Sequence, residues 1–362
     1  MPLETPLLEL HRAASAEIGE TFGTLLPARF GDFVKEYAAA SGTVGLVDSN
    51  FRALFSFTGP DAQRYLNAIL TSNVRDLKPG GGAVGLLLTP QGHILAEVET
   101  FLTDKGMLAS SHAMVRERTF STFDKFIIMD DVTLEDATTK IGTLDLVGPL
   151  AAAVISEVCG VDLAGLAAFS HVEAILGAIP CRIVRKAWLD HPAAMIVAPR
   201  EHLPALWSEL EARVRARGGT SAGMAAINSI RLEWGTPWFG HDFGDKNIPH
   251  EAGLEHSHIS YEKGCYTGQE IVERVRSRGH ANRRLTELQF SGPDAPAAGA
   301  LLLHDGKEIG EVTSAAISPA LGRPIGLGYV RREHTAVGTR LDASGTPAEV
   351  IRPPLPAKLP AA

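Results

Sequence analysis

The segment Lys263–Glu270, which reads KGCYTGQE, constrains this chain more than any other stretch of similar length. It places a thiol, an ammonium, a phenol, an amide and a carboxylate around two glycines. The glycines permit a sharp turn or a close approach of the backbone to a ligand. A lysine close to a cysteine favours the thiolate form of the thiol. Two interpretations stay open, an active-site loop with Cys265 as nucleophile or a glycine-rich turn around an inert, buried cysteine.

The composition is that of an ordinary globular protein. Its 362 residues suffice for two or three domains with cores of their own. The net charge of -8 argues against a general nucleic-acid-binding protein. The three cysteines lie far apart and form no C-x-x-C pair, which argues against a disulfide framework or a zinc ribbon. Because neither a signal-peptide pattern nor an apolar run of membrane-spanning length is present, we expect a cytoplasmic protein that does not contact membranes.

The order of apolar residues, glycines and prolines predicts an α+β fold. Helices are expected at Asp61–Leu70 and Leu150–Val158, each after a strand and a Gly-Pro pair, and at Leu203–Arg217. Strands at Ala83–Leu88 and His93–Leu102 are expected to form a hairpin. Three weaker expectations are helical pieces within Leu7–Ala39 and extended segments at Met107–Val115 and Lys125–Val132.

The sequence pattern changes near residue 283, where short expected strands replace the mixture of helices and strands. We expect residues 1–282 to form two α+β subdomains, of which the inner one spans roughly residues 55–140. Short strands separated by Gly and Pro predict a small β-barrel over residues 283–352. Residues 353–362 form a proline-rich tail, expected to be disordered or to lie along the surface.

Two sequence patterns resemble known binding motifs but do not meet the requirements of those motifs. Gly80–Gly85 matches G-x-G-x-x-G, but it precedes a predicted strand and not a helix, so we reject a dinucleotide site. His250, His256 and His258 lack the spacing of a zinc site, and we expect no metal ligands among them.

The residues around the KGCYTGQE segment suit a flat, aminated heterocycle with a carboxylate tail, which describes a folate. Glu233 can accept two parallel N–H bonds from such a ring. Arg274, Arg276 and Arg278 alternate, so in an extended segment they would share one face and could hold carboxylates. Aromatic side chains that could stack on the ring are Trp234, Trp238, Phe239 and Tyr266.

The KGCYTGQE segment resembles the motif of the YgfZ-type folate-binding proteins, which are relatives of the glycine-cleavage T protein, an aminomethyltransferase. The resemblance extends over nearly the whole chain. Further matching stretches are Gly45–Asp48, Gly59–Ala62, Leu70–Val74, Leu88–Gly92, Arg231–Glu233, Glu251–Leu254, Ile309–Ser314 and Gly328–Val330.

The resemblance implies a three-part, cloverleaf fold around a central tetrahydrofolate pocket. It implies that Glu233 reads the pterin and that Cys265, with Lys263 and Tyr266, forms the reactive part of the site. It also implies a role in the assembly or repair of iron–sulfur proteins, which would be the partners. The other positions that it assigns to the cofactor are Asn73, Glu97, Gln269 and Arg274.

One departure from the T proteins bears on activity. T proteins carry two aspartates shortly after the glycine of the hairpin turn, where this chain has Ala96 and Glu97. Aminomethyl transfer needs a carboxylate at a set distance from the reacting nitrogen. Glu97 either takes over part of the role of the missing aspartate or is an acid at the surface or at the rim of the pocket. The leading hypothesis is therefore a folate-binding accessory protein, the alternative is a folate-dependent aminomethyltransferase or demethylase, and the third is a scaffold without folate affinity.

Overall fold

The computed structural model describes residues 2–353, with the side chains of residues 187, 188 and 278 excepted. The chain divides into two compact units. Unit 1 takes in the chain up to Leu87, together with Ala96–Ile227 and Ser260–Tyr266. Unit 2 takes in Leu88–Leu95, Asn228–Ile259 and the chain from Thr267 onward.

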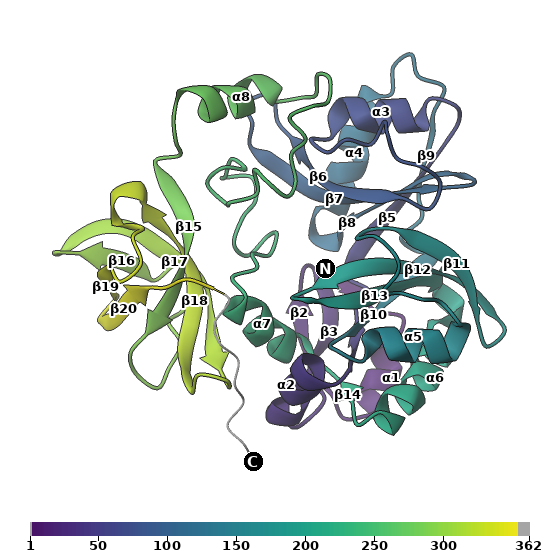
Figure 1. Cartoon of the computed structure of the whole chain (residues 1–362), viewed down its shortest axis with the longest axis horizontal. Coiled ribbons are helices and arrows are strands. Elements are labelled where there is room, and N and C mark those ends of the chain that lie inside the picture. Colours follow the sequence, from purple (N-terminus) through teal and green to yellow (C-terminus); the bar gives the residue numbers. More distant parts are fainter. Residues whose placement is uncertain (1, 354–362) are drawn as a thin grey trace. The chain divides into compact units, whose positions relative to one another are not determined.

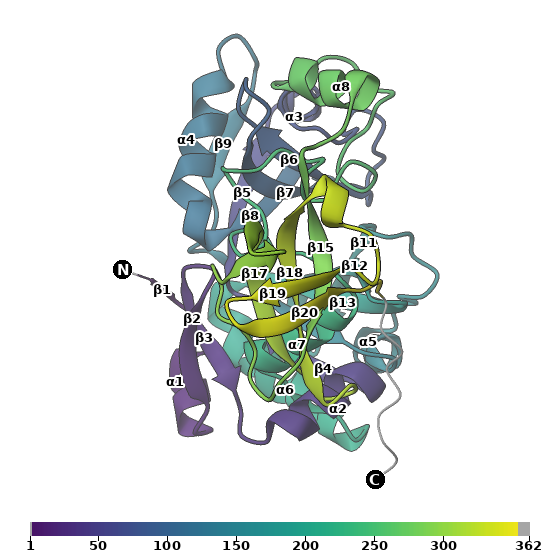
Figure 2. The ribbon, with the colours of Figure 1, turned by 90° about the vertical axis from the view of Figure 1, so that its left-hand side faces the viewer.

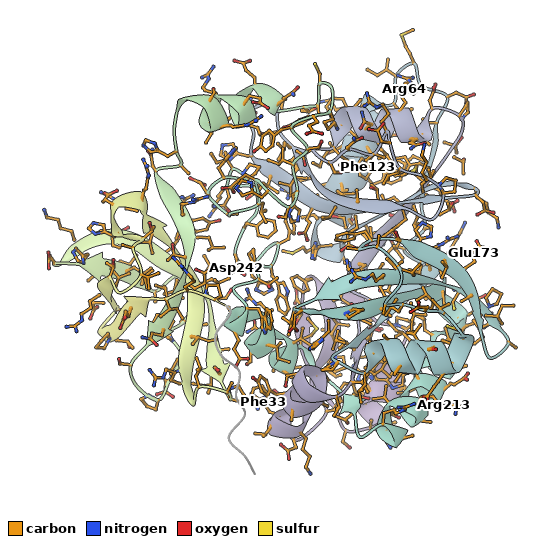
Figure 3. The ribbon with its side chains drawn as sticks, viewed as in Figure 1. Phe33, Arg64, Phe123, Glu173, Arg213 and Asp242 are labelled. Carbon is orange, nitrogen blue, oxygen red and sulfur yellow. The ribbon has the colours of Figure 1, made fainter. Side chains whose placement is uncertain are left out.

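The first layer of unit 1 is a five-stranded sheet in the order β6-β7-β8-β5-β9. Two helices cover one of its faces, α3 and α4 (Figures 1 and 2). Phe123 of α4, labelled in Figure 3, packs edge-on against Phe57 of β5, with ring centroids 5.1 Å apart. The elements of this layer are β5 (Arg52–Thr58), α3 (Ala62–Ile69), β6 (Gly82–Leu88), β7 (Ile94–Thr103), β8 (Gly106–His112), α4 (Arg116–Phe126) and β9 (Thr133–Asp136).

The second layer of unit 1 is a six-stranded sheet in the order β11-β12-β13-β10-β4-β14. Helices α5 and α6 bury their apolar faces against it, with Trp207 and Leu210 of α6 inside the core (Figure 1). Helix α5 ends at Gly160, whose φ of 72° is the left-handed conformation that glycine adopts without strain. The elements are α2 (Phe33–Gly42), β4 (Gly45–Asp48), β10 (Ile141–Val147), α5 (Ala151–Cys159), β11 (His171–Leu176), β12 (Ile179–Trp188), β13 (His191–Pro199), α6 (Leu203–Ala216) and β14 (Thr220–Ser221).

Of two local expectations, one was confirmed and one was wrong. The helical pieces expected within Leu7–Ala39 lie at its two ends, and between them Phe22 and Gly23 adopt positive φ and turn the chain into a hairpin. Lys125–Val132 is the end of α4 followed by a loop, and its apolar residues Ile128 and Met129 are exposed. The N-terminal elements are β1 (Leu3–Glu4), α1 (Leu8–Ala13), β2 (Glu17–Thr21) and β3 (Thr24–Arg29).

Unit 2 contains a closed barrel in the order β15-β18-β17-β16-β19-β20, as the strand pattern predicted. Leu288, Leu302 and Val330 lie in its core. The predicted α+β class with a C-terminal barrel is thus confirmed, while the tail from residue 354 lies outside the described residues. The elements are α7 (Met224–Glu233), α8 (Gln269–Arg278), β15 (Arg283–Phe290), β16 (Leu301–His304), β17 (Lys307–Ser318), β18 (Arg323–Arg331), β19 (Arg340–Ala343) and β20 (Thr346–Val350).

No helix within residues 2–353 is both long enough and apolar enough to cross a membrane.

Candidate functional site

Lys263 is fixed by the end of helix α3. Its buried ammonium donates to the backbone carbonyls of Asn67, Leu70 and Ser72, the last at 3.0 Å. Burial lowers the pKa of Lys263 to about 8. An ammonium has three N–H donors, and three carbonyls take them up. Lys263 therefore satisfies the open carbonyls at the C-terminus of α3 and has no further donor for a hydrogen bond to Cys265.

The two residues after Gly264 differ in exposure. Cys265 is exposed, whereas Tyr266 is buried with its ring 5.2 Å from the Lys263 ammonium. Exposure makes the Cys265 thiol accessible, which the alternative of an inert, buried cysteine would not allow. The other two cysteines belong to the core of unit 1, and burial raises the pKa of Cys181 to about 11.

The second half of the KGCYTGQE segment packs against the tip of the β6–β7 hairpin, within unit 2. Gly268 has a φ of +83°, and a Cβ placed there would lie 2.6 Å from the carbonyl oxygen of Thr89. Gly92 has a φ of +80°, and a Cβ there would lie 2.9 Å from Ile271 of α8. The hairpin and the cysteine segment, about 175 residues apart in sequence, are thus held together by two glycines that both need the absence of a side chain.

Replacing Gly268 by alanine is expected to destabilise the protein by about 2–4 kcal/mol, because the residue would combine a strained φ with a backbone clash. Gly264 in the same segment is the matched control, since nothing lies within 4 Å of its Cβ position. Urea unfolding of Gly268→Ala and Gly264→Ala measures the difference. Equal midpoints for the two variants would contradict the packing.

Gln269 and Arg274 lie on helix α8, which begins directly after Gly268. Arg274 pairs with Glu270 one turn earlier at 2.9 Å, and Arg276 pairs with Glu273. The condition under which the arginines would share a face, an extended segment, is therefore not met. On a helix, residues two apart do not share a face, so Arg274 and Arg276 do not form one clamp.

Glu233 ends helix α7 and is buried in unit 2. Its carboxylate accepts a hydrogen bond from the hydroxyl of Ser318, at the end of β17. Its neighbour Leu232 packs against Ile325 and Leu327 of the barrel. The carboxylate is thus held in place by the barrel, as a group that orients a ligand needs to be.

Arg231 of α7 forms a buried ion pair with Asp242, which is labelled in Figure 3. Asp242 also accepts hydrogen bonds from the backbone N–H of Trp238 at 2.9 Å and from the hydroxyl of Thr313 at 2.6 Å. The hydroxyl of Ser314 is a fourth donor to the same carboxylate. This network joins α7 and the loop after it to strand β17, and it therefore stabilises the surroundings of Glu233.

Asn73 lies in unit 1, in the turn after β-bridge residue Leu70. Its side-chain amide donates to Asp76 at 2.7 Å, and its side-chain oxygen accepts from the Asp76 backbone N–H at 3.3 Å. These bonds give Asn73 a local role in closing a turn.

Glu97 belongs to a charged cluster in unit 1 that sequence reasoning missed. Glu97 and Glu99 lie two residues apart on β7 and therefore share one face of the sheet. Arg52 of β5 lies 3.3 Å from Glu99 and 3.7 Å from Asp145 of β10. Glu97 is a further electrostatic neighbour of Arg52. Lys186 of β12 also pairs with Glu99, so the cluster joins the two large sheets of unit 1.

The carboxylates of this charged cluster differ in proton affinity. Burial alone would raise the pKa of Glu99, but Lys186 and Arg52 outweigh it and lower that pKa to about 2. Burial raises the pKa of Asp145, despite Arg52 and Lys186. Paired acids with diverging pKa values are frequent at functional sites. The only sequence signal for the cluster was the position of Glu99 two residues after Glu97, because the other members are distant along the chain.

The low pKa of Glu99 predicts a pH-dependent effect of Glu99→Gln. A depressed pKa stabilises the fold above the ordinary value of 4.5, and this contribution is lost as the pH falls through about 2. The variant should therefore unfold about 2–3 kcal/mol more easily at pH 7, and this difference should shrink between pH 4.5 and 2. Urea titrations across this range measure it, with Glu135→Gln on exposed β9 as control. A difference that does not change with pH would contradict the assignment.

Two family models match the chain in sequence order. The GCVT N-terminal domain matches residues 7–260, and the glycine cleavage T-protein C-terminal barrel domain matches residues 283–355. The chain belongs to the glycine cleavage T-protein family. Aminomethyltransferases of this family use tetrahydrofolate. The narrower YgfZ-type assignment is not distinguished by these matches and stays a prediction.

Relatives in the T-protein family align along almost their whole length. The aminomethyltransferase of Streptomyces coelicolor is 28% identical over 361 residues, covering 97% of this chain and 96% of the relative. That of Rubrobacter xylanophilus is 28% identical over 329 residues, covering 91% and 87%. The crystal structure of the glycine cleavage system aminomethyltransferase T from Bartonella henselae superposes with a TM-score of 0.87 at 24% identity, covering 98% of both chains. This last likeness shows a shared fold.

Proposed function

We propose that this member of the T-protein family is a tetrahydrofolate-dependent transferase that takes a one-carbon unit from an aminomethyl or N-methyl donor. The observation that carries the proposal is the match of both family models in order, together with relatives named aminomethyltransferase that align over 97% of the chain. This ranks the transferase hypothesis above the accessory-protein hypothesis that led the sequence analysis.

The residues of the charged cluster fit a polar, hydrogen-bonding cofactor. The Nε atom of Arg52 is buried and has no hydrogen-bond partner among the described residues, so the cluster holds an unused donor beside its carboxylates. Glu97, an electrostatic neighbour of Arg52, would hold or move a proton next to the reacting nitrogen. Tetrahydrofolate, when bound, supplies the nitrogen atoms that accept the one-carbon unit. Within unit 2, taken by itself, Glu233 is held by Ser318 and offers a carboxylate of the kind that accepts two parallel N–H bonds from an aminated ring.

Turnover with defined donors tests the proposal. The full chain would be incubated with tetrahydrofolate and a panel of aminomethyl and N-methyl compounds. Methylenetetrahydrofolate would be measured for the aminomethyl donors and methyltetrahydrofolate for the N-methyl donors, because neither transfer then needs an oxidant. Formation of the corresponding product with at least one donor is expected. Tight tetrahydrofolate binding without turnover across the panel would contradict the transferase and favour the accessory protein, and absence of binding would favour the scaffold.

A second candidate function remains because Cys265 is exposed within an intact KGCYTGQE segment. It is the folate-dependent accessory role in iron–sulfur assembly or repair, with iron–sulfur proteins as partners. This role predicts that Cys265→Ala fails to restore iron–sulfur enzyme activity in cells that lack the protein. The transferase predicts that the same variant keeps its turnover within about 3-fold, since the acid–base residue is Glu97 and not the thiol.

A further inference from the structure

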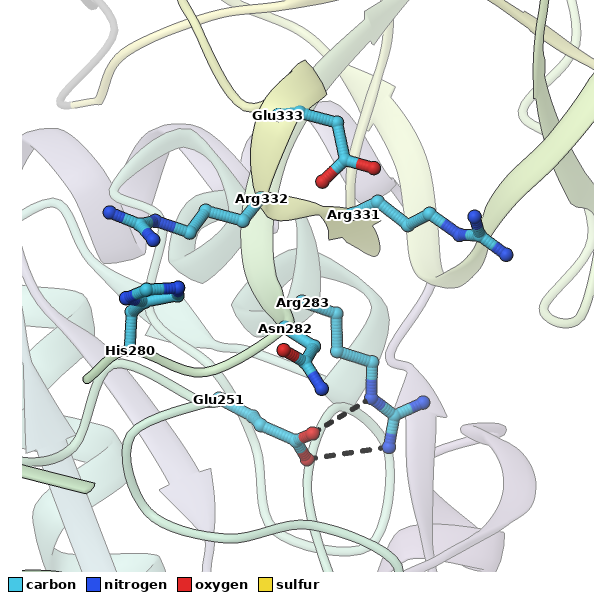
Figure 4. A pocket seen from close by; sticks show the side chains of 7 residues that line it. All are labelled: Glu251, His280, Asn282, Arg283, Arg331, Arg332 and Glu333. Carbon is cyan, nitrogen blue, oxygen red and sulfur yellow. Dashed lines mark hydrogen bonds and ion pairs between the residues drawn. The ribbon is translucent and has the colours of Figure 1, made fainter. Parts of the chain in front are cut away.

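Unit 2 has a pocket of about 830 Å³ where strand β15 begins and strand β18 ends (Figure 4). It lies within the barrel region and includes none of the candidate site residues above. Its volume falls in the range of pockets that hold small organic ligands, and it is much larger than a single ion requires.

The backbone around this pocket is fixed by the barrel. Arg283 and Arg331 are paired across β15 and β18. The backbone N–H of Arg332 donates to the carbonyl of Asn282 at 3.0 Å. The side chains at these positions thus project from a hydrogen-bonded frame, so their Cα positions need little ordering when a ligand binds.

The pocket carries an excess of unpaired positive charge. Glu251 is neutralised by Arg283, which donates to it from two nitrogens at 3.1 and 3.3 Å. Arg331 and Arg332 have exposed guanidinium groups with no ion pair or hydrogen bond to any part of the chain between residues 2 and 353. Glu333 is the one remaining acid of the lining, which leaves a net charge of +1 on a chain whose formal charge is -8. The pocket therefore favours anions, against the charge of the whole protein.

The two unpaired arginines point to different sides of the pocket. Arg332 lies beside His280, whereas the guanidinium of Arg331 points to the opposite side, with Asn282 between them (Figure 4). Arg331 is the last residue of β18, and Arg332 begins the short 3-10 helix Arg332–His334, so the two side chains leave from different elements. One compact oxyanion cannot contact both guanidinium groups in this arrangement, but a ligand with an anionic group at each end can. Guanidinium groups pair best with planar carboxylates.

We propose that this pocket binds a small organic dicarboxylate, with one carboxylate on Arg332 and His280 and the other on Arg331. The Asn282 amide contacts the spacer or the nearer carboxylate. The site is independent of the one-carbon chemistry proposed above.

Isothermal titration of the full chain with glutarate tests the site, with butyrate and inorganic phosphate as the comparison probes. We expect saturable glutarate binding that is about 10-fold or more tighter than that of either comparison probe, because only glutarate engages both arginines. Binding should weaken as salt is raised. Absence of saturable glutarate binding, or equal affinity for phosphate, would overturn the proposal.

Four substitutions at exposed residues assign the effect to the pocket. Arg331→Gln and Arg332→Gln should each weaken glutarate binding about 10-fold. Arg323→Gln, at the other end of strand β18, is the matched control and should change the affinity less than about 2-fold. Glu333→Gln should tighten binding, a gain that loss of folding cannot imitate. Equal weakening by Arg323→Gln and Arg331→Gln would show that the effect is one of general charge and would refute the site.

Discussion

Glu97→Gln is expected to lower turnover of the one-carbon donor by roughly 100-fold or more, with little change in tetrahydrofolate affinity. The substitution keeps the shape of the side chain but removes its capacity to take up a proton, and positioned general bases contribute about 10²–10⁴ to rate. Glu97 is the acid that the resemblance to the T proteins assigns to the cofactor, and it lies within the charged cluster as an electrostatic neighbour of Arg52. Steady-state kinetics and folate titration of the same preparation measure both quantities.

Two variants control the Glu97 experiment. Glu97→Asp keeps the carboxylate and should retain a measurable part of the turnover, since only its reach is shortened. Glu135→Gln removes an exposed acid from β9 of the same unit and should be unchanged. If Glu97→Gln has full activity while Cys265→Ala has none, the thiol and not the carboxylate carries the chemistry.

Asp242→Ala is expected to destabilise the protein by about 3–5 kcal/mol. It would leave the buried guanidinium of Arg231 without a counter-charge, and its hydrogen-bond acceptors within residues 2–353 would then be the side chain of Asn228 at 2.9 Å and the carbonyl of Thr236 at 3.1 Å. The donors of Thr313 and Ser314 would also lose their acceptor. Chemical denaturation at pH 7 measures the loss.

A double-mutant cycle separates the ion pair from its packing. Removing both charges, with Arg231→Met and Asp242→Asn together, should cost less than the sum of the two single variants, because neither charge is then left buried alone. Glu9→Gln breaks an exposed pair with Arg12 and should change stability by about 0.5 kcal/mol or less. Additive single effects would mean that Arg231 and Asp242 do not stabilise one another.

Local sequence patterns predicted those parts of the fold that short-range physics decides. The helix near Asp61–Leu70, the hairpin at Ala83–Leu102 and the closed barrel follow from apolar periodicity and from glycine and proline positions. Helix α8 was not predicted, because the alternating arginines were considered only for an extended segment and the helical spacing of Ile271, Val272 and Val275 was not used. The start signal after Gly268 and the Glu270–Arg274 pair favoured the helix as well.

The charged cluster could not be predicted, because its members come from four strands. Arg52, Asp145 and Lys186 have nothing in their local sequence that distinguishes them from surface charges. Only the pairing of β5, β10 and β12 in the folded chain places them around Glu99. The role of Lys263 was equally hidden, since the carbonyls that it binds lie almost 200 residues earlier in the chain.

The division of the chain into its two units limits which segments can be exchanged between members of this family. The chain passes between the units five times, at Leu87, Leu95, Ile227, Ile259 and Tyr266, so neither unit is one continuous stretch. The barrel strands also supply Thr313, Ser314 and Ser318, which satisfy Asp242 and Glu233. A chimaera that takes only the barrel from another protein, or a truncation before residue 283, would leave the buried carboxylates of Asp242 and Glu233 without these hydrogen-bond donors. Recombination within this family should therefore succeed when whole chains are exchanged, and fail at the boundary between the two family models.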